Sequence, residues 1–176
     1  MKKNSLNLSP VTRKVAFSGI LCALALALSA VEMMIPPLPM LPPGAKLGLS
    51  NLVTMYAAES LWLFPALTIA LLKGLFAGTV RGFTAMLMSL SGGLLSTFVM
   101  WLLLKLPKRP FGYIGLGVAG AMAHNGAQLF IAALMTTPAV VYYVPWLILF
   151  GALTGTLTGF ALGVLSPALN KLNLSL

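Results

Sequence analysis

Residues 15–35 read VAFSGILCALALALSAVEMMI, and this stretch decides the fold because Glu32 is its only charged residue. A helix needs about 20 predominantly apolar residues to cross the hydrocarbon core of a bilayer. The rest of the 176-residue chain is similar in character: 59% of it is hydrophobic, 7% is charged and the mean hydropathy is +0.99. Soluble domains carry about 25% charged residues, so the composition predicts an integral membrane domain.

Six apolar stretches predict an all-α integral membrane protein, a six-helix transmembrane bundle. Four of them have spanning length, whereas the second and third are short and are separated at Pro65. The short pair forms either two tilted spans or a half-membrane hairpin. We expect a single transmembrane domain over residues 15–165, a lead at 1–14 and a tail at 166–176. The predicted spans are 15–35, 47–63, 65–80, 84–104, 111–135 and 141–165.

The basic residues predict the orientation. Loops on the cytoplasmic side carry an excess of Lys and Arg, and placing the N-terminus in the cytoplasm puts eight of the eleven basic residues inside. We therefore expect a multi-pass protein of the cytoplasmic membrane with both termini in the cytoplasm. The net charge of +9 then reflects topology rather than binding to nucleic acid. The eight residues are Lys2, Lys3, Arg13, Lys14, Lys105, Lys108, Arg109 and Lys171.

The composition also excludes several chemistries. Glu32 and Glu59 are the only acidic residues, and there is no Asp. Cys22 is the single cysteine, so neither a disulfide framework nor a cysteine zinc site is expected. The chain has no Gly-x-x-x-x-Gly-Lys-Ser/Thr motif for nucleotide hydrolysis. We expect no enzymatic activity, no metal and no cofactor, and energy for transport would have to come from a partner or an ion gradient.

Polar side chains from several predicted spans fall at one depth, toward the outside. Ionisable groups inside a membrane are costly and generally face a cavity or a partner. The basic side chains at this depth outnumber the acidic ones, so a pocket here would favour an anionic or strongly polar solute. The basic residues are Lys46, Arg81 and His124, and the acidic one is Glu32. Alternatively, Arg81 anchors in lipid headgroups or pairs with Glu32, and His124 bonds a neighbouring helix. The predicted ligand contacts are Glu32, Asn51, Arg81, His124, Asn125 and Gln128.

A second polar pair lies in the two short spans. Counting about 1.5 Å per residue along both helices places Glu59 and Lys73 roughly 6 Å apart in depth. Either the two form a structural ion pair, or Lys73 contributes to the cavity.

Two segments are candidates to cover such a pocket. The loop at 36–45, which includes Pro36 and Pro43, has five prolines in ten residues and so favours an extended trace. This loop is either a connector or a lid. Near the start of the last span, three aromatic residues either cover the site or form an interfacial belt. They are Tyr142, Tyr143 and Trp146.

Small residues recur every four positions along two spans, which allows another helix to approach closely. In the last span the pattern predicts packing within the bundle, through Gly151, Gly155, Gly159 and Gly163. In the first span the pattern fits either internal packing or the docking of a partner membrane protein, through Gly19, Ala23 and Ala27.

Two blocks carry a family resemblance, residues 72–97 (LKGLFAGTVRGFTAMLMSLSGGLLST) and 119–128 (AGAMAHNGAQ). They resemble the Gx transporter family, whose members are often labelled heptaprenyl diphosphate synthase component I. The layout is also similar to that of the S components of energy-coupling factor (ECF) transporters. That likeness implies a ligand site open to the outside under the first external loop. It also implies that Ala23 and Ala27 dock a shared transmembrane subunit.

The resemblance therefore implies a substrate-binding subunit of an importer. It would capture a small anionic or vitamin-like solute and would work with a transmembrane coupling subunit and ATPases supplied in trans. The alternative is a non-catalytic membrane subunit that assists heptaprenyl diphosphate or quinone biosynthesis. A chain-elongating synthase needs paired Asp-rich motifs to hold magnesium, so a chain without Asp is not its catalytic subunit.

Overall fold

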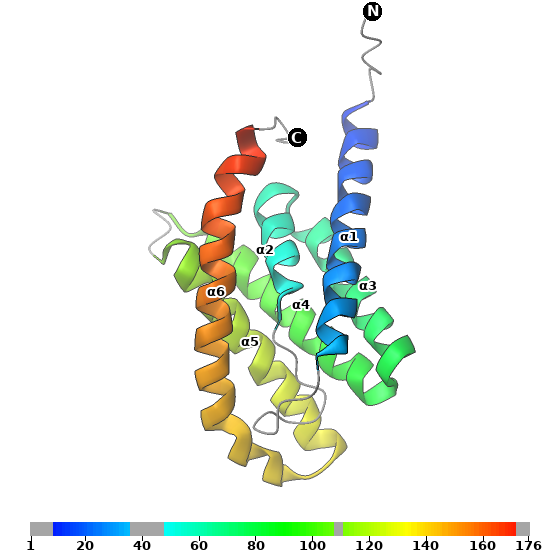
Figure 1. Ribbon diagram of the computed structural model, residues 1–176, viewed down its shortest axis with the longest axis vertical. Helices are drawn as coiled ribbons and strands as arrows, with labels where there is room; N and C mark the ends of the chain where they lie inside the picture. Colours follow the sequence, from blue (N-terminus) through cyan, green and yellow to red (C-terminus); the bar gives the residue numbers. More distant parts are fainter. Residues whose placement is uncertain (1–8, 36–47, 108–110, 172–176) are drawn as a thin grey trace, which may run out of the picture.

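The computed structural model describes residues 9–35, 48–107 and 111–171, which form six α-helices and one short 3-10 helix (Figure 1). The all-α, six-helix prediction is confirmed. The elements are α1 (Pro10–Met34), α2 (Asn51–Ser60), α3 (Leu63–Arg81), α4 (Phe83–Lys105), α5 (Gly112–Met135), η1 (Pro138–Tyr143) and α6 (Val144–Lys171).

Five of these helices are long and apolar enough to cross a membrane, and α2 is the exception. Its ten residues span about 15 Å, half the thickness of a hydrocarbon core of about 30 Å. The predicted shortness of the second span is therefore confirmed. The predicted shortness of the third span is wrong, because α3 has 19 residues and spans by itself. Pro65 lies in the first turn of α3, where its missing N–H has no helical partner to lose, and the helix break falls at Trp62.

The helices α3, α4, α5 and α6 pack side by side in chain order, and α1 covers α2 and α3. The short helix α2 lies inside this arrangement and contacts α1, α3, α4 and α6. Figure 1 shows that α1 begins and α6 ends at the same end of the bundle, which we call the terminal end. α2 also ends there, and α6 continues to Lys171, into the segment predicted as a tail.

Close packing of α5 against α6 depends on glycine. A Cβ atom built at Gly155 would lie 2.6 Å from the Cα of Val118, and one at Gly159 would lie 2.7 Å from the Cα of Ile114. Neither backbone atom can move aside without separating the helices, so these positions admit no side chain. The small residues of the last span therefore pack within the bundle, as predicted.

Substituting Gly159 by alanine should destabilise the protein, because the new methyl group meets the α5 backbone. We expect Gly159→Ala to cost about 1–3 kcal/mol, the usual range for an overpacked core. The measurement is thermal unfolding in detergent. Gly163→Ala is the matched control, since its Cβ would make only an ordinary contact 3.5 Å from the Tyr113 ring. Equal stability of the two variants would contradict this account of the interface.

Candidate functional site

The start of α2 is held by a buried carboxylate from α1. Glu32, which is 5% exposed, accepts hydrogen bonds from the backbone N–H of Leu49 and from Oγ of Ser50, the latter at 3.0 Å. Both donors belong to the turn that precedes α2. A helix N-terminus carries unpaired N–H groups and a partial positive charge, so a carboxylate there is stabilising. Glu32 thus fixes the position at which α2 begins.

A buried ammonium group reaches the same place from α3. Lys73 is 5% exposed, and its Nζ donates a hydrogen bond to Oδ1 of Asn51 at 2.9 Å. Asn51 is the first residue of α2. Side chains from α1 and α3 therefore converge on the start of the one helix that does not span the membrane.

Asn51 also lines a small internal cavity on the other side of α2. The cavity has a volume of about 10 Å³, which is room for roughly one water molecule. Its walls come from the start of α2 and from α4, α5 and α6. Asn51 lies between this cavity and Lys73, because it lines the first and accepts a hydrogen bond from the second. The lining residues are Gly48, Asn51, Met55, Met100, Gly117, Gly120, Ala121, Thr154 and Thr158.

The other end of α2 is held by a second carboxylate. Glu59 accepts hydrogen bonds from Oη of Tyr113 at 2.8 Å and from Oγ of Ser166 at 3.2 Å. The two hydroxyl groups also contact each other, at 3.3 Å. We call Glu59, Tyr113 and Ser166 the terminal-end triad, and it joins α2 to α5 and α6.

Of the two alternatives for Glu59 and Lys73, the ion pair between them is therefore wrong. Lys73 bonds Asn51 at the start of α2, whereas Glu59 lies eight residues later, about 12 Å along the helix axis. Glu59 faces α5 and α6 rather than α3. The predicted difference in depth, roughly 6 Å, was therefore too small, because Lys73 contacts the start of α2 and Glu59 lies near its end.

The terminal-end triad lies about one helical turn from the residues that line the cavity. Tyr113 lies one helical turn from Gly117, and Glu59 lies one turn from Met55, and both of these neighbours line the cavity.

Two of the three predicted contacts on α5 are buried next to α4. His124 packs on Gly92, where a Cβ atom would lie 2.9 Å from the imidazole ring. Gln128 is also buried, and its Oε1 has no hydrogen-bond partner among the residues that the structure describes. Asn125 points the other way, and its Nδ2 donates to the Leu147 carbonyl of α6 at 3.0 Å. Of these three, none lines the small cavity.

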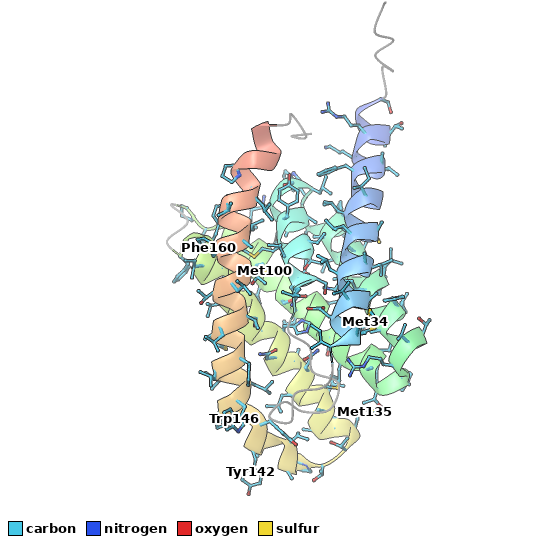
Figure 2. The ribbon with its side chains drawn as sticks, viewed as in Figure 1. Met34, Met100, Met135, Tyr142, Trp146 and Phe160 are labelled. Atoms are coloured by element: carbon cyan, nitrogen blue, oxygen red, sulfur yellow. The ribbon has the colours of Figure 1, made fainter. Side chains whose placement is uncertain are left out.

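Other predicted site residues lie apart from the start of α2. Arg81 is exposed at the end of α3, which fits its alternative role as a headgroup anchor and removes it from the site. Figure 2 shows Tyr142 and Trp146 at the far end of the bundle, and Tyr142 is 81% exposed. Tyr143 packs with Met88, Ala132 and Val140. Pro36, Pro43 and the rest of the predicted lid lie outside the described residues.

Comparison with known families decides what kind of chain this is. The sequence model described as Heptaprenyl diphosphate synthase component I matches residues 21–165. The chain belongs to this family. The match confirms the resemblance carried by residues 72–97 and 119–128. Comparisons with curated proteins and with solved structures give no match.

In this member of the family, the small-residue face of α1 points out of the bundle. Gly19, Ala23 and Ala27 are exposed, and a Cβ atom at Gly19 would meet nothing within 4 Å. The glycines of α6 are covered by α5, but this face is open. Of the two alternatives for the first span, internal packing is therefore wrong for these residues.

Sequence reasoning missed several residues that shape the site in this family member. Ser50, Tyr113 and Ser166 were not singled out, because hydroxyl groups near span ends are common and carry no charge. A signal existed for Lys73, since a lysine in the middle of an apolar span is costly. No three His, Cys, Asp or Glu side chains gather within the described ranges in a way that would hold a metal ion.

Removing the hydroxyl group of Tyr113 should destabilise the terminal-end triad. Hydrogen bonds to charged groups contribute about 1.5–3 kcal/mol, so Tyr113→Phe should lower stability by that amount in a thermal unfolding measurement. Tyr142→Phe is the matched control, because Tyr142 is exposed. If both variants unfold at the parent temperature, the triad does not hold α2.

Proposed function

We propose that this chain is the membrane substrate-binding component of an ECF-type importer. It captures a small anionic or vitamin-like solute from outside the cell and passes it on together with a transmembrane coupling subunit and ATPases supplied in trans. In this proposal the chain has no enzymatic activity of its own.

The observation that carries the proposal is the pairing of Lys73 with Asn51 at the start of α2, beside an internal cavity. An ammonium group has three N–H donors, and one of them goes to Asn51. Charged donors make strong, short hydrogen bonds to carboxylate and phosphate oxygens. A solute that carries such a group can therefore replace Asn51 as the acceptor for one of the Lys73 protons.

Solute binding also requires the cavity to widen, because about 10 Å³ holds only a water molecule. The start of α2 is the element suited to move. It is attached through side-chain hydrogen bonds from Glu32 and Lys73, whereas α5 and α6 are fixed by direct backbone contact. Moving Asn51 away from Gly117 and Gly120 would open the cavity toward Lys73.

The exposed face of α1 supports a coupling subunit as the partner. Gly19, Ala23 and Ala27 offer a strip with little side-chain bulk, which lets a second helix approach closely in the membrane. The sequence has no phosphate-binding loop, so the energy for release would come from the ATPases of the partner complex.

A second candidate function has its own support. The family description names a component of heptaprenyl diphosphate synthase, and an apolar crevice of about 430 Å³ opens between α5 and α6. It is a shallow apolar surface of α6 beside Ile114 of α5, against which an isoprenoid chain could lie. In this alternative the chain is a non-catalytic subunit that holds a lipid product for a synthase. The crevice is lined by Ile114, Leu149, Ala152, Leu153, Thr156, Leu157 and Phe160.

Native mass spectrometry of the gently solubilised protein separates the two candidates. A water-soluble anion that co-purifies supports solute capture, and a polyprenyl lipid supports the synthase subunit. If a polyprenyl lipid co-purifies with the protein and no water-soluble anion does, the import proposal is overturned.

Replacing Lys73 should weaken solute capture. We expect Lys73→Gln to bind the co-purifying solute roughly 10- to 100-fold more weakly, since a hydrogen bond from a charged group contributes about 1.5–3 kcal/mol. The measurement is the solute-dependent rise in unfolding temperature. Arg81→Gln is the matched control on the same helix and should bind like the parent, because Arg81 is exposed. Weak binding by Arg81→Gln with normal binding by Lys73→Gln would refute this site.

A bulky residue on the open face of α1 should block assembly with the coupling subunit. We expect Ala27→Trp to fold normally, because Ala27 is exposed, and to lose co-purification with the coupling complex. Leu24→Trp is the control, since Leu24 is an exposed large residue on the same helix. Assembly of Ala27→Trp at the parent level would contradict docking through this face.

A further inference from the structure

A lysine and a tryptophan meet where two spans end on the same side of the bundle. Nζ of Lys105 lies 4.1 Å from the centroid of the Trp62 ring and 5.6 Å from that of Trp101. A cation within about 6 Å of an aromatic ring is attracted by the charge distribution of the ring. Lys105 is the last residue of the candidate span Phe83–Lys105, and Trp62 immediately precedes the candidate span Leu63–Arg81, so the group lies at the boundary between hydrocarbon and water.

The residue that makes this contact, Trp62, has a strained backbone conformation. Trp62 has φ 80° and ψ 179°, and among the described residues it is the only non-glycine with positive φ. This region of backbone space is essentially limited to glycine and costs of order 1–3 kcal/mol for other residues. Gly82, at the start of α4, has φ 88° and ψ 179°. The same turn is thus made by glycine before α4 and by tryptophan before α3.

Burial of the ring does not explain why tryptophan stands there, because Trp62 is 65% exposed. What the ring contacts is the ammonium group of Lys105, which is itself exposed. Trp101 packs against the core of the bundle and so fixes the other side of the group. The strain therefore holds a positive charge in a defined place at the membrane boundary.

The chain does not supply the anion for this charge from its carboxylate side chains. Glu32 accepts hydrogen bonds at the start of α2 and Glu59 accepts them at the end. Arg13 and Lys14 of α1 are exposed at the same terminal end and add positive charge. An anionic group from outside the chain, located at the depth of lipid headgroups, fits this arrangement.

We propose that Lys105, Trp62 and Trp101 form a binding site for the phosphate headgroup of an anionic phospholipid in the leaflet at the terminal end. Lys105 donates hydrogen bonds to the phosphate, and the Trp62 ring covers the ammonium group and packs on the glycerol and upper acyl chains. Tryptophan suits this depth because its ring is apolar and its N–H is polar. The site does not depend on which solute the chain carries.

The test uses the full-length protein in phosphatidylcholine vesicles with and without phosphatidylglycerol, followed by native mass spectrometry of retained lipid. The parent should retain phosphatidylglycerol in preference to phosphatidylcholine. Lys105→Gln should retain it roughly tenfold more weakly, the loss expected for one hydrogen bond from a charged group to the phosphate, and Lys105→Arg should restore it. Inorganic phosphate, added in a separate arm, should not compete at equal concentration, because it has no acyl chains to place against Trp62.

Two variants distinguish this site from general attraction to a charged surface. Lys14→Gln removes an exposed charge at the same end, and it should leave retention close to that of the parent. Trp62→Gly removes the ring and relieves the backbone strain, so it should unfold no earlier than the parent and yet lose phosphatidylglycerol as Lys105→Gln does.

Several outcomes would overturn the proposal. Equal losses in Lys14→Gln and Lys105→Gln would indicate a diffuse charge effect. Full retention by Trp62→Gly would show that the ring takes no part. Complete competition by inorganic phosphate would indicate a site for a small anion. If the parent retains no phosphatidylglycerol and Lys105→Gln loses a bound protein, then Lys105, Trp62 and Trp101 bind a protein partner instead of a lipid.

Discussion

The structure depends on one constraint, which is that a helix too short to span the bilayer must find partners for both of its ends inside the protein. Hydrocarbon offers no water to unpaired N–H and C=O groups. The chain has two acidic residues, and both act on α2. Glu32 reaches from α1 and accepts hydrogen bonds at the start of the helix, whereas Glu59, which cannot pair with carbonyl groups, ties the end to α5 and α6 through two hydroxyl groups. Five spanning helices therefore enclose a sixth that is anchored by polar contacts rather than by length.

This anchoring divides the bundle into a rigid part and an adjustable part. The contact of α5 with α6 is made by backbone against backbone at Gly117, Gly155 and Gly159, and packed interfaces of this kind tolerate no change in spacing. The start of α2 is attached through side chains, which exchange partners at small cost when another acceptor of similar strength is offered. A bundle built this way can respond to a solute at the start of α2 without disturbing its outer wall.

The sequence was sufficient to predict the number of helices, the short second span and the internal packing of the α6 glycines, because these follow from length, hydropathy and spacing. It was not sufficient to predict how each helix is rotated about its own axis.

His124 and Asn125 share one arc of α5, yet one faces Gly92 of α4 and the other faces the Leu147 carbonyl of α6. Depth counting placed Glu59 near Lys73, but Lys73 contacts the start of α2 and Glu59 joins its other end to α5 and α6. Arg81 is exposed at the end of α3. Hydropathy cannot locate the end of a span to within one helical turn, so it could not tell whether this side chain faces the site or the surroundings of the bundle. The same four-residue spacing gave a covered face on α6 and an open face on α1, and only the neighbours of each helix decide between them.

Lys73 is the residue that folding alone does not explain. An ammonium group in the middle of a span is costly even when it is hydrogen-bonded, and an apolar side chain of similar size would avoid that cost. Trp62 poses the same question at the membrane boundary, where glycine would make the turn without strain. In both places the structure keeps a side chain that lowers its own stability, and in both places that side chain positions a positive charge. The two recognition sites that we propose for negatively charged groups, one inside the bundle and one at its edge, would account for both.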